Sequence, residues 1–486
     1  MTVTPILLHG ASMPPPTPEL LAALSDLLGP KGFTQDTDTM APWLSDWRGQ
    51  VHGAAAAMLS PVDTSEVQAI LRLCAAVGAT LTMQGGNSGQ CGGATPDDSG
   101  DALLLSLRRM NRIRSVDAGA MQLMGDAGVI LTHAHEAAEA AGLRFPLTLG
   151  GKGSATLGGL VSTNAGGTQV LRHGTMRALI LGLEVVLADG SLLDMMMPLA
   201  KDNQGFDPKQ MFIGAEGTLG VVTGVTLRLV PNIASRCVGW FSVGSPHDAL
   251  RALRHIEPAL GKSLEGFEII PQEALDHVLH HVPGTRAPIA TTGPWHVLVE
   301  LVAEREEADP APRVEAALAE LLEAGIASDA TIAANEAQAE AFWKLRDSIS
   351  EGERAVGPAI QHDISVPVDR MPDYIDAVPH QIAAAFPGAT SLAFGHLGDG
   401  NVHFHFRPPI GTDANAWIAE HGKGASHIVY AAAVAMGGSI SAEHGIGRIK
   451  RDVLAELGDP VRLSILNAVK SALDPRGLLN PGVLIP

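Results

Sequence analysis

The chain has 486 residues, enough for two or three domains that each bury their own core. Hydrophobic residues make up 46% of the chain and charged residues 17%, a balance typical of globular rather than disordered proteins. The formal net charge of -19 makes nucleic acid and anionic membrane surfaces poor partners. A local arginine or metal can still attract an anionic substrate.

Cysteine usage and the N-terminal sequence predict the compartment. Cys74, Cys91 and Cys237 lie far apart and lack the spacing of a metal site, which fits a reducing compartment. The N-terminal stretch has no basic segment before an apolar one and is interrupted by Pro14–Pro16, so it does not resemble a secretory signal. No apolar run approaches the roughly 20 residues that span a bilayer. We expect a cytoplasmic protein without a transmembrane segment.

The elements expected up to residue 231 describe a leader followed by a glycine-rich region of helices and strands. A helix is predicted near Pro18–Leu28. A second helix begins at Asp63, which can cap it with Glu66 at the third position, and ends at Gly78. The later strand signals are Thr80–Met83, a hairpin at Asp189-Gly190, and a strand within Gly220–Pro231 that ends on proline.

Beyond residue 232 helical and strand-like patterns alternate, which favours an α+β domain. The clearest patterns are helices at Pro246–Leu260 and Pro310–Ala324, a strand at Trp295–Val302, and a mostly helical stretch over 415–475.

Three glycine-rich loops interrupt the first region, at Gln84–Gly93, Pro146–Gly167 and Glu216–Val222. Successive bare N–H groups form concavities suited to phosphate oxygens. The first loop alone is equally compatible with a flexible surface loop, and it lacks the helix that a Rossmann fingerprint requires. Three such loops together indicate one large phosphorylated ligand, such as a dinucleotide.

These motifs carry a family resemblance. In chain order they are QGGNSG, GGLVSTNAGG, EGTLG and the terminal LNPG. Together they resemble the FAD-binding PCMH-type domain of the vanillyl-alcohol oxidase superfamily, in its D-2-hydroxyglutarate and D-lactate dehydrogenase branch. The resemblance implies an α+β fold with a leader and helix over 1–50 and a two-part FAD-binding domain over 51–231. It further implies a substrate- and metal-binding α+β domain over 232–414. A helical segment over 415–486 is expected to complete the active site.

The resemblance also implies which residues bind FAD. The pyrophosphate falls to the first loop, at Gln84, Gly85, Gly86, Asn87, Ser88 and Gly89. The rest of the cofactor falls to Gly153, Ser154, Gly158, Gly159, Ser162, Asn164, Gly166, Glu216, Gly217, Val222 and Asn480. Some relatives attach FAD through a histidine of the first loop. This loop has none, so we expect non-covalent FAD, with Cys91 as a weak candidate for attachment.

A hairpin is predicted at Ser391–Phe406, with Asp399-Gly400 as a two-residue turn. In that register His396 faces His403, close enough for both to bind one metal, and period two places His405 on the same face. The alternative is that these are ordinary strand histidines. The resemblance implies Glu443 as third ligand and His444 as the base beside the flavin. Two histidines and one glutamate with an open position suit Zn²⁺, with Fe²⁺ or Mn²⁺ as alternatives.

Substrate contacts are expected on a helix over Glu336–Ser350, which places Arg346 and Ser350 one turn apart on one face. Arginine suits a carboxylate, although a solvated surface arginine is the commoner case. The resemblance assigns Arg346 to the substrate. Gln361 and His405 depart from the dicarboxylate-oxidising branch, which carries lysine and asparagine there. The missing lysine weakens the case for a second substrate carboxylate.

The resulting hypothesis is an FAD- and metal-dependent dehydrogenase that oxidises a D-2-hydroxy acid to the 2-oxo acid. The metal lowers the pKa of the substrate hydroxyl, His444 takes its proton as base, and the Cα hydride passes to flavin N5. A flavoprotein or quinone carrier is the expected electron acceptor, and a homodimer is one candidate assembly. The alternatives are a D-2-hydroxyglutarate-specific dehydrogenase, an oxygen-using flavin alcohol oxidase, a metal-dependent hydrolase and a non-catalytic flavin module.

Overall fold

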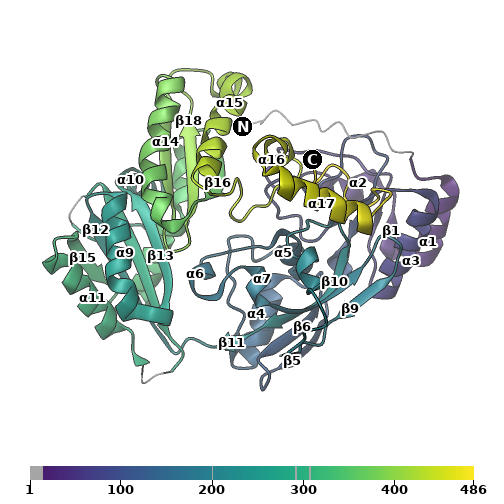
Figure 1. Ribbon diagram of the computed structural model, residues 1–486, viewed down its shortest axis with the longest axis horizontal. Helices are drawn as coiled ribbons and strands as arrows, with labels where there is room; N and C mark the ends of the chain where they lie inside the picture. Colours follow the sequence, from purple (N-terminus) through teal and green to yellow (C-terminus); the bar gives the residue numbers. More distant parts are fainter. Residues whose placement is uncertain (1–14, 200, 291–292, 306–307) are drawn as a thin grey trace. The chain divides into compact units, whose positions relative to one another are not determined.

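The computed structural model describes residues 15–199, 201–290, 293–305 and 308–486 (Figure 1). They form two compact units. Unit 1 contains the described residues up to Gly167, Gly174–Asn232 and Glu443–Pro486; unit 2 contains Thr168–His173 and Ile233–Ala442. Residues 1–14, the first part of the predicted leader, lie outside the described residues.

Unit 1 contains two principal sheets, which match the predicted two-part domain. One has the order β1-β2-β4-β3, formed by β1 (Phe33–Thr34), β2 (Ala57–Leu59), β3 (Leu81–Gln84) and β4 (Leu103–Ser106). The other is antiparallel with the order β5-β6-β10-β8-β9, formed by β5 (Ile113–Asp117), β6 (Gln122–Asp126), β8 (Ile180–Val186), β9 (Leu192–Met195) and β10 (Val221–Arg228). A two-stranded ribbon pairs β7 (Leu143–Arg144) with β11 (Val230–Pro231). The predicted hairpin at Asp189-Gly190 is confirmed as β8–β9.

Unit 1 has one main apolar core and a smaller apolar cluster of Met40, Met58 and Leu104. Its helices are α1 (Pro18–Gly32), α2 (Thr37–Met40), α3 (Thr64–Val77), α4 (Leu131–Ala140), α5 (Leu157–Thr163), α7 (Met176–Leu179), α8 (Lys209–Phe212), α16 (Arg451–Leu457) and α17 (Pro460–Leu473). Asp63 caps α3 by accepting from the Glu66 N–H, and Gly78 ends it in the left-handed conformation, as predicted. Leu20, Leu24 and Leu28 of α1 join the core, so the helix of the predicted leader is part of unit 1.

Unit 2 is built on one seven-stranded antiparallel sheet of order β15-β12-β14-β13-β17-β18-β16. Its strands are β12 (Ser235–Val243), β13 (Leu264–Pro271), β14 (Trp295–Ala303), β15 (Ala327–Ile332), β16 (Ile360–Ser365), β17 (Thr390–His396) and β18 (Asn401–Arg407). Helices α9 (Pro246–Leu260), α11 (Ala311–Glu323), α14 (Met371–Ala385) and α15 (Ala414–Ala435) pack on one face (Figure 1). Helices α10 (Gln272–His281), α12 (Glu336–Asp347) and α13 (Ile349–Val356) pack on the other, and α6 (Val170–His173) contacts β13.

Two predictions about helices differ from the structure. The helix expected over Glu336–Ser350 is broken at Ser348, which ends α12 and begins α13. The helical segment expected over 415–486 is divided, because α15 belongs to unit 2 whereas α16 and α17 belong to unit 1. None of the helices in the described part of the chain has the length and apolar character needed to cross a bilayer.

Candidate functional site

The first glycine loop of unit 1 follows β3 and is fixed by its own side chains. Gln84 donates from Nε2 to the carbonyls of Trp43 and Ala94, at 2.9 Å in each case. Asn87 adopts a left-handed conformation with φ of 52° and donates from Nδ2 to the Ser45 carbonyl at 2.7 Å. A Cβ on Gly86 would lie 1.7 Å from the Ser154 carbonyl oxygen, so only glycine permits this approach. The first two predicted glycine loops therefore lie against each other.

Buried polar atoms beside this loop test whether a polar cofactor fits. Among the described residues, Gln84 Oε1, Thr156 Oγ1 and Asn480 Oδ1 are buried without a hydrogen-bond partner in the protein. Burying such atoms unpaired costs free energy, so a ligand that pairs with them is stabilised there. A Cβ on Gly89 or Gly153 would meet nothing within 4 Å. Open space beside unpaired polar atoms fits a dinucleotide.

The other predicted cofactor residues also lie in unit 1, and several hold the backbone. Ser162 donates to the Gly158 carbonyl, and Asn164 ends α5 with φ of 50°. Both carboxylate oxygens of Glu216 accept backbone N–H groups, from Ile446 at 2.8 Å and Gly447 at 2.7 Å. The remaining predicted residues of unit 1 are Gly85, Ser88, Gly159, Gly166, Gly217 and Val222.

Glu216 therefore has a structural use that the sequence did not reveal. Its pKa is raised by burial, which outweighs the two backbone hydrogen bonds that favour the charged form. Asn480 donates from Nδ2 to the Glu216 carbonyl at 2.7 Å. The EGTLG and LNPG motifs are thus hydrogen-bonded to each other.

In unit 2 the predicted metal hairpin forms in a different register. His396 pairs with Asn401, and His403 pairs with Phe394, so the loop is Leu397–Gly400 rather than a two-residue turn. The predicted facing of His396 and His403 is wrong by two residues. An even shift preserves the face of a strand, so both rings still lie on one side of the sheet, with centroids 5.5 Å apart. His405 shares that side, as predicted.

The neighbouring strands add polar side chains to this side, on which Phe394 and Leu392 of β17 also lie. Asp363 and Gln361 of β16 lie opposite His403 and His405, and Glu268 of β13 lies opposite His396. We call this surface the polar face; it comprises Glu268, Gln361, Asp363, His396, Asn401, His403 and His405. Glu268 and Asp363 were not predicted. Two glutamates, Glu265 and Glu268, within the largely apolar strand Leu264–Pro271 were the available signal for Glu268.

Arg346 reaches the polar face from α12. It is 8% exposed, and its Nε donates to Glu268 Oε2 at 2.7 Å. Burial alone would raise the pKa of Glu268, but His396 and Arg346 together lower it to about 2. Ser350 is exposed on α13, whereas Arg346 is buried. The expectation that they share one face is therefore wrong, because the break at Ser348 interrupts the helical periodicity.

A second buried carboxylate, Glu353 of α13, adjoins His405. Glu353 is 1% exposed and accepts from Arg407 Nη2 at 2.7 Å and contacts His277 Nδ1 at 2.5 Å. His405 Nδ1 lies 3.5 Å from Glu353 Oε2. Burial opposes ionisation, yet these partners lower the pKa of Glu353 to about 2. No pattern in the sequence indicates that this glutamate is buried.

Glu443 and His444 are the first two residues of the C-terminal part of unit 1. The chain approaching them is fixed in unit 2, where Ser439 and Ser365 exchange backbone hydrogen bonds of 2.8 and 3.1 Å. Ser365 is the last residue of β16, the strand that carries Gln361 and Asp363.

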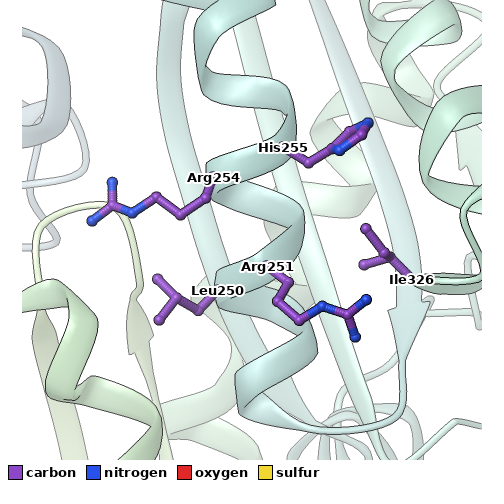
Figure 2. A pocket seen from close by; sticks show the side chains of 5 residues that line it. All are labelled: Leu250, Arg251, Arg254, His255 and Ile326. Carbon is purple, nitrogen blue, oxygen red and sulfur yellow. The ribbon is translucent and has the colours of Figure 1, made fainter.

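A surface hollow in unit 2 lies elsewhere, around α9 (Figure 2). Its cationic side chains are engaged: Arg251 pairs with Asp248, Arg254 with Asp369, and His255 Nε2 lies 3.4 Å from Glu320. This hollow shares no residue with the polar face and offers no comparable set of ligands.

Comparison with known proteins assigns the family. Residues 233–484 match the model described as FAD linked oxidases, C-terminal domain, and residues 55–196 match the model described as FAD binding domain. The chain belongs to the FAD-linked oxidases. It is therefore a flavoprotein oxidoreductase, and the predicted FAD-binding domain is confirmed.

Curated relatives of this FAD-linked oxidase share about a third of its residues. The D-2-hydroxyglutarate dehydrogenase, mitochondrial, of Bos taurus is 35% identical over 96% of this chain and 83% of the relative. The D-2-hydroxyglutarate dehydrogenase of Xanthomonas citri is 34% identical over 90% of this chain and 91% of the relative. A putative D-lactate dehydrogenase, mitochondrial, of Schizosaccharomyces pombe is 32% identical over 90% and 83%, respectively.

Solved structures confirm the fold. An alkyldihydroxyacetonephosphate synthase superposes with a TM-score of 0.72 at 17% identity, covering 99% of this chain and 88% of that one. A p-cresol methylhydroxylase superposes with a TM-score of 0.69 at 15% identity, covering 96% of both chains. The predicted PCMH-type fold is confirmed.

Proposed function

We propose that this FAD-linked oxidase oxidises a D-2-hydroxy acid to the corresponding 2-oxo acid. The curated relatives named as D-2-hydroxyglutarate and D-lactate dehydrogenases support this substrate class. The observation that carries the proposal is the polar face of unit 2. There a buried arginine suited to a carboxylate stands beside two histidines suited to a metal.

FAD would be held in unit 1 by the first two glycine loops and by Asn480. The unpaired Gln84 Oε1, Thr156 Oγ1 and Asn480 Oδ1 and the open space at Gly89 support this assignment. When bound, FAD supplies a hydride acceptor at flavin N5. The protein residues fix the position of the ring and the pyrophosphate.

A divalent metal, with Zn²⁺ as first candidate and Fe²⁺ or Mn²⁺ as alternatives, would be held by His396, His403 and Glu443. Imidazole and carboxylate ligands suit these ions, and such a metal lowers the pKa of a substrate hydroxyl. The two backbone hydrogen bonds that fix Ser439 beside Ser365 support Glu443 as the third ligand. Four residues of chain span at most about 14 Å, so Glu443 stays within reach of β16.

The remaining residues act on the substrate directly. Arg346 would bind the carboxylate next to the reacting carbon, a group that every 2-hydroxy acid carries. His444 would take the hydroxyl proton as general base. Gln361 and His405 face each other across β16 and β18 and would contact the distal end of the substrate. Because Gln361 is neutral, we propose that D-lactate and apolar D-2-hydroxy acids compete with D-2-hydroxyglutarate.

The cellular setting is proposed on less specific grounds. Cys74, Cys91 and Cys237 are buried and form no disulfide, which supports a reducing compartment and, with it, a cytoplasmic location. Electrons would leave to a flavoprotein or quinone carrier, and the chain would act as a homodimer. A D-2-hydroxyglutarate-specific dehydrogenase is the second candidate function, favoured by the names of several relatives.

Turnover with an artificial electron acceptor tests the proposal. The FAD-loaded protein should convert D-lactate and D-2-hydroxyglutarate to their 2-oxo acids and leave the L enantiomers unchanged. Chelation should abolish turnover, and Zn²⁺ should restore it. Equal turnover of both enantiomers would contradict the assignment. Peroxide formed in proportion to the 2-oxo acid would identify an oxygen-using oxidase instead.

A further inference from the structure

Glu268 occupies the position between the candidate metal ligand and the candidate substrate arginine. It lies on β13 and is 1% exposed. Its Oε1 lies 2.6 Å from His396 Nδ1, and its Oε2 lies 2.7 Å from Arg346 Nε. Burying a carboxylate is costly unless it is paired and hydrogen-bonded, and here each oxygen has its own cationic or donating partner.

The two contacts of His396 define which of its nitrogens carries hydrogen. A carboxylate accepts only, so the Nδ1 that faces Glu268 carries the hydrogen. Arg346 donates only, and its Nη2 lies 3.4 Å from His396 Nε2, a contact that favours a lone pair on Nε2. A metal requires that lone pair. Metal-binding histidines characteristically donate their other N–H to a carboxylate.

Arg346 is held by the same carboxylate. Its guanidinium carbon lies 5.3 Å from the centre of the Phe394 ring, and its Nε is bonded to Glu268. The planar group is thereby fixed at the edge where His396 Nε2 presents its lone pair. A bound 2-hydroxy acid requires the metal and the arginine to lie close to its own carboxylate.

We propose that Glu268 is a positioning residue that orients the metal ligand His396 and the substrate-binding Arg346 together. The inference rests on the proposed function for the roles of those two residues. It adds that the affinity for the metal and the affinity for the substrate both depend on one buried carboxylate, which would itself contact neither the metal nor the substrate.

Glu268→Gln allows only one of the two hydrogen bonds to persist, because an amide offers one acceptor and one donor whereas His396 and Arg346 both donate. Arg346 is always charged, so the amide oxygen should stay with it. The amide NH₂ then faces His396 Nδ1 and drives the hydrogen to Nε2. The Zn²⁺ affinity should fall roughly 10- to 100-fold, the range typical of lost partners of metal ligands. Glu268→Asp retains two acceptors and should recover part of this loss.

The test measures Zn²⁺ affinity of the FAD-loaded, metal-free protein by competition with a chromogenic chelator. Glu300→Gln is the matched control, because Glu300 is a buried carboxylate on the adjacent strand whose partner is Arg236. Unchanged affinity in Glu268→Gln, or an equal loss in Glu300→Gln, would overturn the proposal. Retained FAD in each variant confirms that unit 1 is folded.

Nitrogen-15 shifts of the histidine rings separate this inference from the proposed function. The His396 signal, assigned by its absence in His396→Ala, should show hydrogen on Nδ1 in the unmodified metal-free protein and on Nε2 in Glu268→Gln. Failure of the unmodified protein to bind Zn²⁺ would overturn the metal site of the proposed function. An unchanged His396 tautomer in Glu268→Gln would overturn the role of Glu268, whether or not zinc binds.

Discussion

Two buried glutamates organise the charged side chains of unit 2. Glu268 pairs with Arg346 and His396, and Glu353 pairs with Arg407 and His277. In both cases burial disfavours the charged carboxylate, but the paired groups outweigh this effect and lower the pKa below its usual value. Removing one member of such a network leaves its partners buried and unpaired, which costs more than the pair itself contributes.

Glu353 should make the stability of unit 2 depend on acidity. Its pKa of about 2 lies below the usual 4.5, so its contribution is complete above about pH 5 and is lost as the pH falls towards 2. Glu353→Gln should cost roughly 2 to 3 kcal/mol at neutral pH and lose less stability on acidification. Urea unfolding across this range measures both effects, with exposed Glu351→Gln as control. Parallel acid profiles for the Glu353 variant and the unmodified protein would refute this assignment.

His444→Ala tests the proposed base. The variant should retain FAD and metal, because neither depends on this imidazole, yet reduce the flavin more slowly. A general base contributes typically about 10²- to 10⁴-fold. Single-turnover reduction measures the loss, and metal and flavin content supply the control. A decrease below about threefold would show that another group takes the proton.

Gln361→Lys tests specificity. A lysine opposite His405 would pair with a distal carboxylate, and charge-assisted bonds are roughly twice as strong as neutral ones. The ratio of kcat/KM for D-2-hydroxyglutarate over D-lactate should therefore rise, whereas neutral Gln361→Met should not raise it. A natural preference for the dicarboxylate above about a hundredfold, unchanged by the lysine, would show that this position does not set specificity.

At the scale of elements, the sequence predicted faces better than registers. Alternation along β17 and β18 placed His396, His403 and His405 on one side, and that holds because the shift in register is even. The turn was predicted from Asp399-Gly400 alone, whereas the structure extends the loop to Leu397–Gly400 and places Val366 O against Gly400. Such contacts are tertiary, so local propensity does not contain them.

The break between α12 and α13 has a similar origin. The periodicity of Glu336–Ser350 contains no proline or glycine that predicts an end at Ser348. The packing of α13 against α10 redirects the chain, with Gly352 close to the backbone of His277. Ser350 therefore leaves the face that Arg346 occupies.

Two alanine substitutions in the first glycine loop of unit 1 should have different effects. Gly86→Ala should destabilise the apoprotein by about 1 to 3 kcal/mol, because its Cβ would overlap the Ser154 carbonyl. Gly89→Ala meets only open space, so the apoprotein should unfold like the unmodified one, while FAD, which needs the bare backbone, should bind more weakly. Thermal unfolding and flavin fluorescence titration separate these effects. Normal FAD binding by Gly89→Ala would remove this loop from the pyrophosphate site.

At the scale of the molecule, each unit is assembled from segments distant in sequence. The chain returns to unit 1 at Glu443, and the six residues Thr168–His173 belong to unit 2. A prediction of consecutive domains could not anticipate this, because composition changes little at 443 and only spatial contacts define membership. Nevertheless, every residue that the motifs predict to bind FAD lies in unit 1.

Anaerobic mixing with enantiomers of a 2-hydroxy acid tests the central claim most directly. We expect D-lactate or D-2-hydroxyglutarate to bleach the visible absorbance of the bound flavin and to yield one 2-oxo acid per FAD, whereas the L enantiomers leave the flavin oxidised. Flavin that stays oxidised with every D-2-hydroxy acid, although a chemical reductant bleaches it, would contradict the proposed oxidation of D-2-hydroxy acids.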